Sequence, residues 1–222
     1  MQTGDRLPLF PLDMVLFPHM QLPLYVANES YMRMVDRCIE FDEPFGIVLI
    51  RTGSEKDHSV EPYLVGTTAR VRKVKQLDDG INILVEGEER FRIRELDDTH
   101  QPYLIGTIEP LDENNLPSSP SARKLLKRAQ GSFKIYLELL FASHNVPISV
   151  HFPTDAAVLS FAMAMALDTD PLHKQHFLEL TDTLERFSEL IPQIEQRVDE
   201  MKMSRTTQLD HESFAEEWYS PN

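Results

Sequence analysis

Residues 64–96 read LVGTTARVRKVKQLDDGINILVEGEERFRIREL, and this stretch decides the fold. Two segments rich in β-branched residues flank Leu77-Asp78-Asp79-Gly80, and Asp-Gly between alternating strands is a strong signal for a β-hairpin. Gly87 interrupts the second segment, which favours a bulge or bend where a strand turns a barrel corner. The sequence therefore predicts a long hairpin that bends as part of a small barrel.

Shorter apolar segments extend the strand pattern on both sides of this hairpin. The first two carry prolines, which cannot donate to a strand ladder, so we expect edge or terminal strands there. Residues 45–50 form a continuous apolar run, which is typical of a buried strand. Asn28 is a suitable N-cap for a helix that runs to Phe41 with apolar residues at helical spacing. Besides the two strands of the hairpin, the predicted strands are residues 7–12, 21–26, 45–50 and 103–110.

The residue pattern changes from strand-like to helix-like at a turn-rich linker, residues 114–120. We expect a β-rich pseudo-barrel subdomain over residues 1–116 and an α-helical subdomain over residues 117–205. Residues 206–222 are polar and acidic, and we expect them to form a mobile tail. The predicted class is therefore α+β, with one helix inserted in the barrel and a helical bundle after it.

The last long helix should begin near Phe177, because apolar residues recur every three or four positions from there to Met201. Pro192 lies inside this seam and should kink or split the helix. Packing within the bundle is the ordinary explanation of such a seam. A homodimer through the C-terminal helices is the alternative.

Composition excludes several classes of protein. The formal net charge is -14, so binding of nucleic acid or of an acidic membrane would need a local basic patch. No apolar run approaches the ~20 residues of a membrane span, and the first residues lack the pattern of a signal peptide. The single cysteine excludes an internal disulfide and a four-cysteine zinc site. We expect a cytoplasmic protein.

No group of residues forms a catalytic or metal-binding pattern. Cys38 lies on the apolar stripe of the first helix, where a small buried hydrophobe is the expected role. His173 and His176 share a helical face without a third ligand nearby in the sequence. His144 and His151 lie beside turn residues, where a solvated side chain is the default. We expect no cofactor and no metal.

Basic residues concentrate on the two hairpin strands, where RNA could bind if they shared a face. Nearby acidic residues, Glu86 and Glu88 among them, would neutralise such a patch. An RNA-binding barrel is thus the alternative function, together with a small-ligand pocket. The basic residues are Arg70, Arg72, Lys73, Lys75, Arg90, Arg92 and Arg94.

Several motifs in order along the chain resemble the amino-terminal, substrate-recognition domain of the Lon family of ATP-dependent proteases. The similarity covers residues 7–202, and each motif alone is weak evidence. The resemblance implies a PUA-like pseudo-barrel followed by a helical bundle. The motifs are LPLFPL (7–12), VLFPHM (15–20), LPLYV (22–26), YLVGTTARV (63–71), VEGEERF (85–91) and LELTDTLER (178–186).

The resemblance stops short of the catalytic parts of that family. No G-x-x-x-x-G-K-[ST] loop is present to bind nucleotide phosphates, and the chain ends before a motor or a Ser-Lys protease domain could begin. We therefore expect no enzyme, but a stand-alone module similar to the substrate-recognition domain. One departure is local, because Ala27-Asn28-Glu29 stands where many members have Gly-Arg-Glu.

The resemblance implies binding of unfolded or client polypeptides, alone or with a protease or chaperone. Recognition of such clients needs a tolerant apolar surface, which the first two motifs and the methionines could supply. Nucleic acid and membranes are not expected partners. The candidate binding residues are Phe10, Pro11, Phe17, Pro18, Met20, Leu22, Asn28, Glu29 and Arg33.

Overall fold

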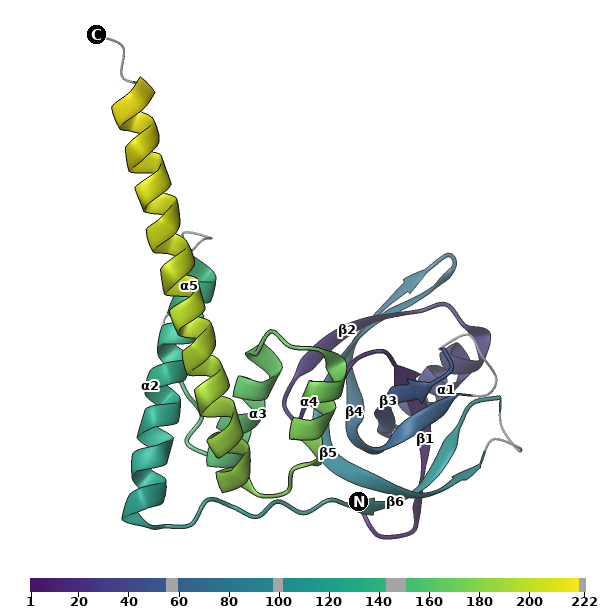
Figure 1. Cartoon of the computed structure of the whole chain (residues 1–222). Coiled ribbons are helices and arrows are strands. Elements are labelled where there is room, and N and C mark those ends of the chain that lie inside the picture. Colours follow the sequence, from purple (N-terminus) through teal and green to yellow (C-terminus); the bar gives the residue numbers. More distant parts are fainter. Residues whose placement is uncertain (55–59, 98–101, 143–150, 220–222) are drawn as a thin grey trace. The chain divides into compact units, whose positions relative to one another are not determined.

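The computed structural model describes residues 1–54, 60–97, 102–142 and 151–219, with side chains up to Ser204 in the last range. Six strands form one sheet in the order β2-β5-β4-β3-β1-β6, and an additional pairing of β5 with β6 closes the sheet into a ring (Figure 1). Only β1 and β3 run parallel. The strands are β1 (Asp5–Leu12), β2 (Gln21–Val26), β3 (Phe45–Thr52), β4 (Glu61–Leu77), β5 (Gly80–Asp97) and β6 (Ile105–Pro110).

The predicted hairpin is confirmed as β4 and β5, which pair from Val65–Arg92 to Leu77–Gly80. Its bend lies beside Gly87, where Glu88 and Glu89 of β5 stand opposite the single residue Thr68 of β4. Beyond this bulge β5 changes partner, from β2 to β6. The change of partner is what closes the ring.

Of the edge or terminal position that its prolines predict, strand β1 has the terminal one: it is the first strand of the chain but not an edge of the sheet. Residues 5–8 pair with β6 and residues 9–12 pair with β3, so β1 lies inside the sheet order. Each half of β1 is paired on one side by these strands. A proline has no backbone N–H group to donate to a neighbouring strand. Pro8 and Pro11 are tolerated because each half of β1 has one side on which no N–H donor is required. β2 is the edge strand that Pro23 predicts.

Helix α1 (Glu29–Glu40) covers one part of the barrel core. The Asn28 side chain accepts hydrogen bonds from the backbone N–H groups of Ser30 and Tyr31, which confirms the predicted N-cap. Met34, Val35 and Cys38 are buried against the inward residues of the strands. The inserted helix is therefore held by an apolar face, as its spacing predicts.

Four further helices follow the barrel strands. They are α2 (Pro120–Ala142), α3 (Ala156–Ala166), α4 (Pro171–Glu179) and α5 (Thr183–Tyr219). The Asp155 and Asp170 side chains cap α3 and α4, and Pro171 occupies the first turn of α4. The α+β class is thus confirmed.

The last helix begins later in the chain than the sequence predicts. Phe177 belongs to α4, because the backbone becomes extended at Leu180 before α5 begins. Pro192 lies inside α5 without splitting it. The buried seam of α5 packs against α2 within one chain, and it comprises Phe187, Leu190, Ile191, Ile194 and Val198.

The chain forms two compact units, and the predicted subdomains 1–116 and 117–205 stay a prediction. One unit comprises residues 1–114 and 164–182, so helix α4 belongs with the strands. The other comprises residues 115–163 and 183–222. The independent folding of these parts, and the mobile tail over 206–222, stay predictions. No helix in the described ranges is long and apolar enough to cross a membrane.

Candidate functional site

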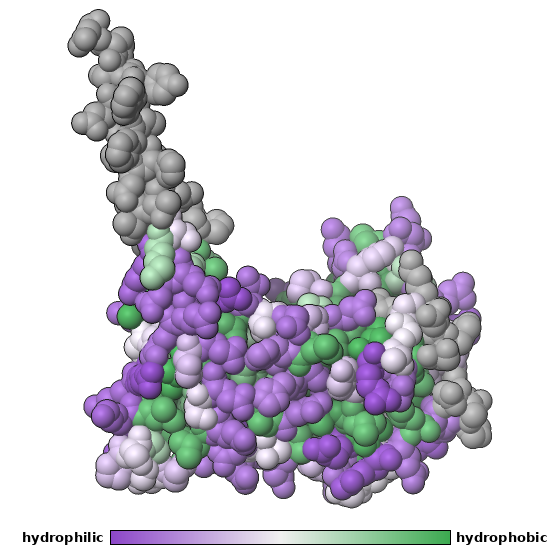
Figure 2. Space-filling view, viewed as in Figure 1, coloured by the Kyte–Doolittle hydropathy of each residue, from purple (hydrophilic) through white to green (hydrophobic). Residues whose placement is uncertain are grey.

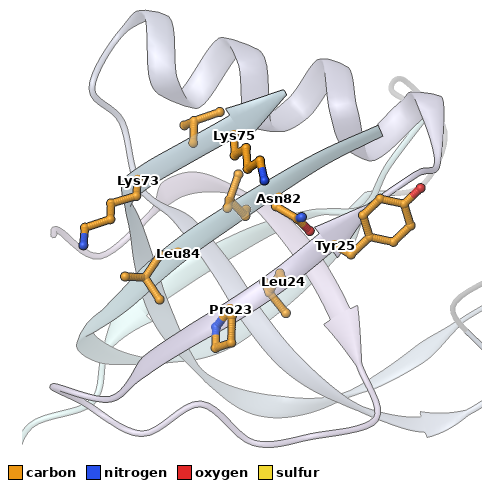
Figure 3. Close-up of a pocket in the computed structure, with 9 residues that line it drawn as sticks. Pro23, Leu24, Tyr25, Lys73, Lys75, Asn82 and Leu84 are labelled. Atoms are coloured by element: carbon orange, nitrogen blue, oxygen red, sulfur yellow. The ribbon is translucent and has the colours of Figure 1, made fainter. Parts of the chain in front are cut away.

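An open groove lies on the outer face of the sheet where β2, β5 and β4 run side by side (Figure 3). Pro23 pairs with Leu84, which in turn pairs with Lys73, so these side chains form one row on the face. The next row is Tyr25, Asn82 and Lys75. We call these six residues the hairpin platform. Together with Leu24, Val74 and Ile83 they line a groove of about 630 Å³.

A second bulge sets which residues of β4 reach the platform. Val71 pairs with Val85, whereas Lys73 pairs with Leu84, so Arg72 is an extra residue in β4. Because of this extra residue, Val71 and Val74 both lie on the inner side of the hairpin, and Lys73 and Lys75 both lie on the outer side.

Tyr25 closes one end of the groove. Its hydroxyl donates a hydrogen bond to the main-chain carbonyl of Asp79 at 3.2 Å, which ties β2 to the hairpin turn. A Cβ at Gly80 would lie 2.6 Å from the carbonyl oxygen of Val26 and 3.0 Å from the Tyr25 ring. Only glycine fits there, so the turn residue that predicts the hairpin also makes room for the aromatic wall.

The two platform lysines stand out electrostatically. In the described part of the chain neither Lys73 nor Lys75 forms an ion pair, although the whole protein is acidic. The neighbouring arginines of β4 are paired: Arg70 with Asp42 and Glu88, and Arg72 with Glu86 and Glu88. The platform therefore combines apolar surface with two available ammonium groups.

The paired arginines weaken the RNA alternative. Arg94 is also paired, with Glu109 at 2.6 Å, and Arg90 is buried with Glu113. Four of the seven basic residues that suggested RNA thus have carboxylate partners. A nucleic acid would have to break these pairs to gain the same charges.

Most of the apolar residues predicted to bind polypeptides lie in the barrel core instead. Phe10, Pro11, Phe17 and Leu22 are buried, and Phe10 stacks on Tyr31 with 4.5 Å between ring centres. Buried positions of this kind support the fold. Pro18 and Met20 are half-buried.

The polar members of that predicted set lie at the start of α1. Asn28 is used as the helix cap, and Glu29 and Arg33 form an exposed ion pair at 3.7 Å. An exposed pair of this type contributes little to stability. A binding role for the predicted set stays a prediction.

The groove itself is absent from the sequence prediction, although Lys73 and Lys75 appear there as part of a basic strand. The groove could have been predicted from the hairpin register, because that register places Lys73, Lys75, Asn82 and Leu84 on one face. The turn at Asp78-Asp79 gives that register.

The other candidate chemistries find structural explanations. Cys38 is buried, and burial raises the pKa of its thiol to about 11, with the nearby Glu43 carboxylate adding to the effect. His173 and His176 contact the ring of Phe177. Among the described residues no group of three or more His, Cys, Asp or Glu is placed to hold a metal ion. His144 lies outside the described residues.

Apolar and polar side chains alternate over the face of the molecule in Figure 2. Large exposed apolar residues of the strand unit include Phe41, Leu64 and Leu172, at 52–60% exposure. Single exposed apolar residues are normal on a protein surface. The platform differs from them because its apolar groups line a defined hollow.

The fold is that of an α+β protein, in which a closed mixed sheet with an inserted helix is followed by a helical part. The family model for the ATP-dependent protease La (LON) substrate-binding domain matches residues 6–196, and the chain belongs to this family. The sequence-based resemblance is therefore confirmed.

Comparisons with individual proteins agree. The Lon protease of Escherichia coli (strain K12) is 27% identical over 207 residues, which are 90% of this chain and 26% of that protein. The Lon protease of Amoebophilus asiaticus is 29% identical over 206 residues, 87% of this chain and 24% of that protein. The chain spans about a quarter of the length of these relatives.

Two solved structures share the fold. A Lon N-terminal domain protein from Xanthomonas campestris superposes with a TM-score of 0.63 at 23% identity, covering 85% of this chain and 98% of that one. The N-terminal domain of the Mycobacterium avium complex Lon protease gives a TM-score of 0.68 at 17% identity, covering 86% and 98%. The relatives therefore align with this chain through a single domain.

Proposed function

We propose that this chain is a non-catalytic module that binds polypeptides with exposed apolar segments, and that the hairpin platform is its binding surface. The observation that carries the proposal is an open groove in a member of a substrate-binding domain family, with apolar walls and two lysines that have no ion-pair partner among the described residues. Unfolded chains share exposed apolar residues, and an open groove on a sheet can accept them without a fixed sequence.

The rest of the proposal follows from the extent of the family match. The match covers the substrate-binding domain, and the motifs of a nucleotide-driven motor and a protease are not in the sequence. The module would thus hold a client while another protein, a protease or a chaperone, acts on it in the cytoplasm. RNA or small-ligand binding is the alternative, and the paired arginines of β4 and β5 count against RNA.

Fluorescence anisotropy with a labelled, permanently unfolded protein tests the proposal. Leu84→Asp places a charge on the groove wall and should weaken binding. Leu64→Asp is the matched control, because Leu64 is exposed on the same hairpin and does not line the groove. If both variants bind the unfolded protein equally well, the hairpin platform is not the binding surface. If the unaltered protein does not bind the unfolded protein, the proposed function is wrong. Steeply salt-sensitive binding of RNA would favour the alternative.

A further inference from the structure

The outer part of β4 has an unpaired edge. Strand β3 pairs with β4 from Glu61 as far as Ala69, and from there to Leu77 β5 is the only strand of the described residues that pairs with β4. Among the described residues, the backbone N–H and C=O groups on the other edge of this part receive no hydrogen bond from another segment. Such an edge is a template for one more strand.

The two sides of this edge differ in chemistry. On the inner side, Val74 and Ile39 of α1 are exposed by 43% and 39%, beside a hollow of about 200 Å³ between α1 and β4. Asp42 and Glu43 also line this hollow together with Arg70, Arg72 and Lys73, so the apolar character of the inner side comes from Val71, Val74 and Ile39. On the outer side stand the unpaired Lys73 and Lys75 (Figure 3).

An added strand would meet these two sides in alternation. Successive side chains of a strand point to opposite faces, so every second residue would lie beside the hollow and the residues between them beside the lysines. Apolar side chains fit the first environment. Carboxylates fit the second, because opposite charges on neighbouring strands stabilise the pairing.

We propose that the occupant of the site is an extended segment with alternating apolar and acidic residues, which adds as a strand to the β4 edge at residues 72–77. This inference rests on the proposed function and deepens it by naming the mode and the client chemistry. Main-chain hydrogen bonds would supply affinity that does not depend on sequence, and the alternation would supply selectivity. Burial of Val74 and Ile39 would add an apolar contribution.

The first test is N-methylation of a fluorescein-labelled peptide in which Asp and Val alternate over about six residues, the length that matches the open edge. In a strand added to one edge, only every second N–H of the peptide faces β4. We expect methylation of one alternate set to weaken binding at least about tenfold and methylation of the other set to leave it nearly unchanged. Equal effects of the two sets would overturn the proposal.

The second test exchanges charges. The double variant Lys73→Glu/Lys75→Glu should weaken binding of the Asp-Val peptide about tenfold and should bind a Lys-Val peptide better than the unaltered protein does. Lys124→Glu/Lys127→Glu on α2, which belongs to the other compact unit, makes the same change of net charge and should leave both affinities unchanged. Equal affinity of the unaltered protein for the two peptides would overturn the proposal.

These measurements distinguish a wrong mode of binding from a wrong function. If the unfolded protein binds and the methylated peptides bind equally, strand addition is wrong and the proposed function stands. If the unfolded protein does not bind at all, both are wrong. Circular dichroism melts of each variant establish that a loss of binding is not a loss of fold.

Discussion

The Arg90 guanidinium donates a hydrogen bond from Nη1 to the main-chain carbonyl of Leu178 at 2.7 Å, across 88 positions of the chain. The same nitrogen donates to the carbonyl of Leu180 at 2.7 Å. These carbonyls lie at the C-terminal end of α4, where a helix lacks internal partners and favours a cation. Arg90 also pairs with Glu113. One buried side chain of β5 therefore caps α4 and fixes the segment after β6.

Arg90→Leu should destabilise the protein by about 3 kcal/mol, because it leaves buried carbonyls and the Glu113 carboxylate without their partner. Urea denaturation followed by circular dichroism measures the change. Arg94→Leu is the matched control on the same strand, and removal of its ion pair with Glu109 should cost less than about 1 kcal/mol because Arg94 is exposed. Equal costs for the two variants would contradict the capping role.

Gly87→Ala should destabilise the protein by about 2–3 kcal/mol through overpacking. A Cβ at this position would lie 2.3 Å from the main-chain oxygen of Phe17, which is backbone and cannot move aside freely. Gly131→Ala is the opposite case, because nothing lies within 4 Å of its Cβ position in α2. We expect that change to stabilise the protein by about 0.5–1 kcal/mol. Thermal melts of the two variants should therefore shift in opposite directions.

Cys38 should react slowly with thiol reagents in the folded protein. With a pKa of about 11, roughly one thiol in a thousand is ionised at pH 8, and the side chain is buried. Unfolding in urea should restore the rate of an ordinary cysteine, as measured with a chromogenic disulfide. Rapid reaction without urea would show that the α1 face opens.

The raised pKa of Cys38 also has a consequence for stability. Above pH 9 the unfolded chain loses the thiol proton while the folded chain keeps it until about pH 11. The free energy of unfolding should therefore decrease as the pH rises from 9 to about 11. The free energy of unfolding of Cys38→Ala should decrease less over the same range. Urea denaturation across this pH range measures the difference.

Glu195 should make the helical unit sensitive to acid. Hydrogen bonds from Arg128 at 2.5 Å and 2.9 Å, and then from Ser132, hold the pKa of this carboxyl below its usual value. A lowered folded pKa contributes stability that is present above the unfolded pKa and is lost as the pH falls through the folded one. Both side chains are partly exposed, so screening by solvent should keep the effect on stability small.

The measurement for Glu195 compares the unaltered protein with Glu195→Gln between neutral pH and pH 3. The variant should lose less stability over this range. Added salt should shrink the difference, since screening weakens exposed pairs. Parallel pH profiles of the two proteins would contradict the assignment.

Most of the correct predictions from the sequence rest on patterns within one segment or two neighbouring segments. Asp79-Gly80 places the hairpin, and the spacing of Met34, Val35 and Cys38 places α1. Each of these signals depends on local backbone chemistry, which a sequence displays directly.

Relationships between distant segments could not be predicted in the same way. The prolines of β1 suggested an edge strand, because the sequence does not show that each half of β1 has a different neighbour. Apolar residues such as Phe17 suggested a binding surface, because exposure depends on what the rest of the chain covers. The open edge of β4 exists only because β3 pairs no further than Ala69.

The strand unit is made of two stretches of chain, residues 1–114 and 164–182. During synthesis all six strands leave the ribosome before the carbonyls that Arg90 caps have been made. The barrel should then pass through a stage in which the Arg90 guanidinium has Glu113 but lacks the carbonyls of Leu178 and Leu180, and it should become resistant to proteolysis only after residue 182 has emerged. A fragment that ends near residue 116 would be arrested at that stage.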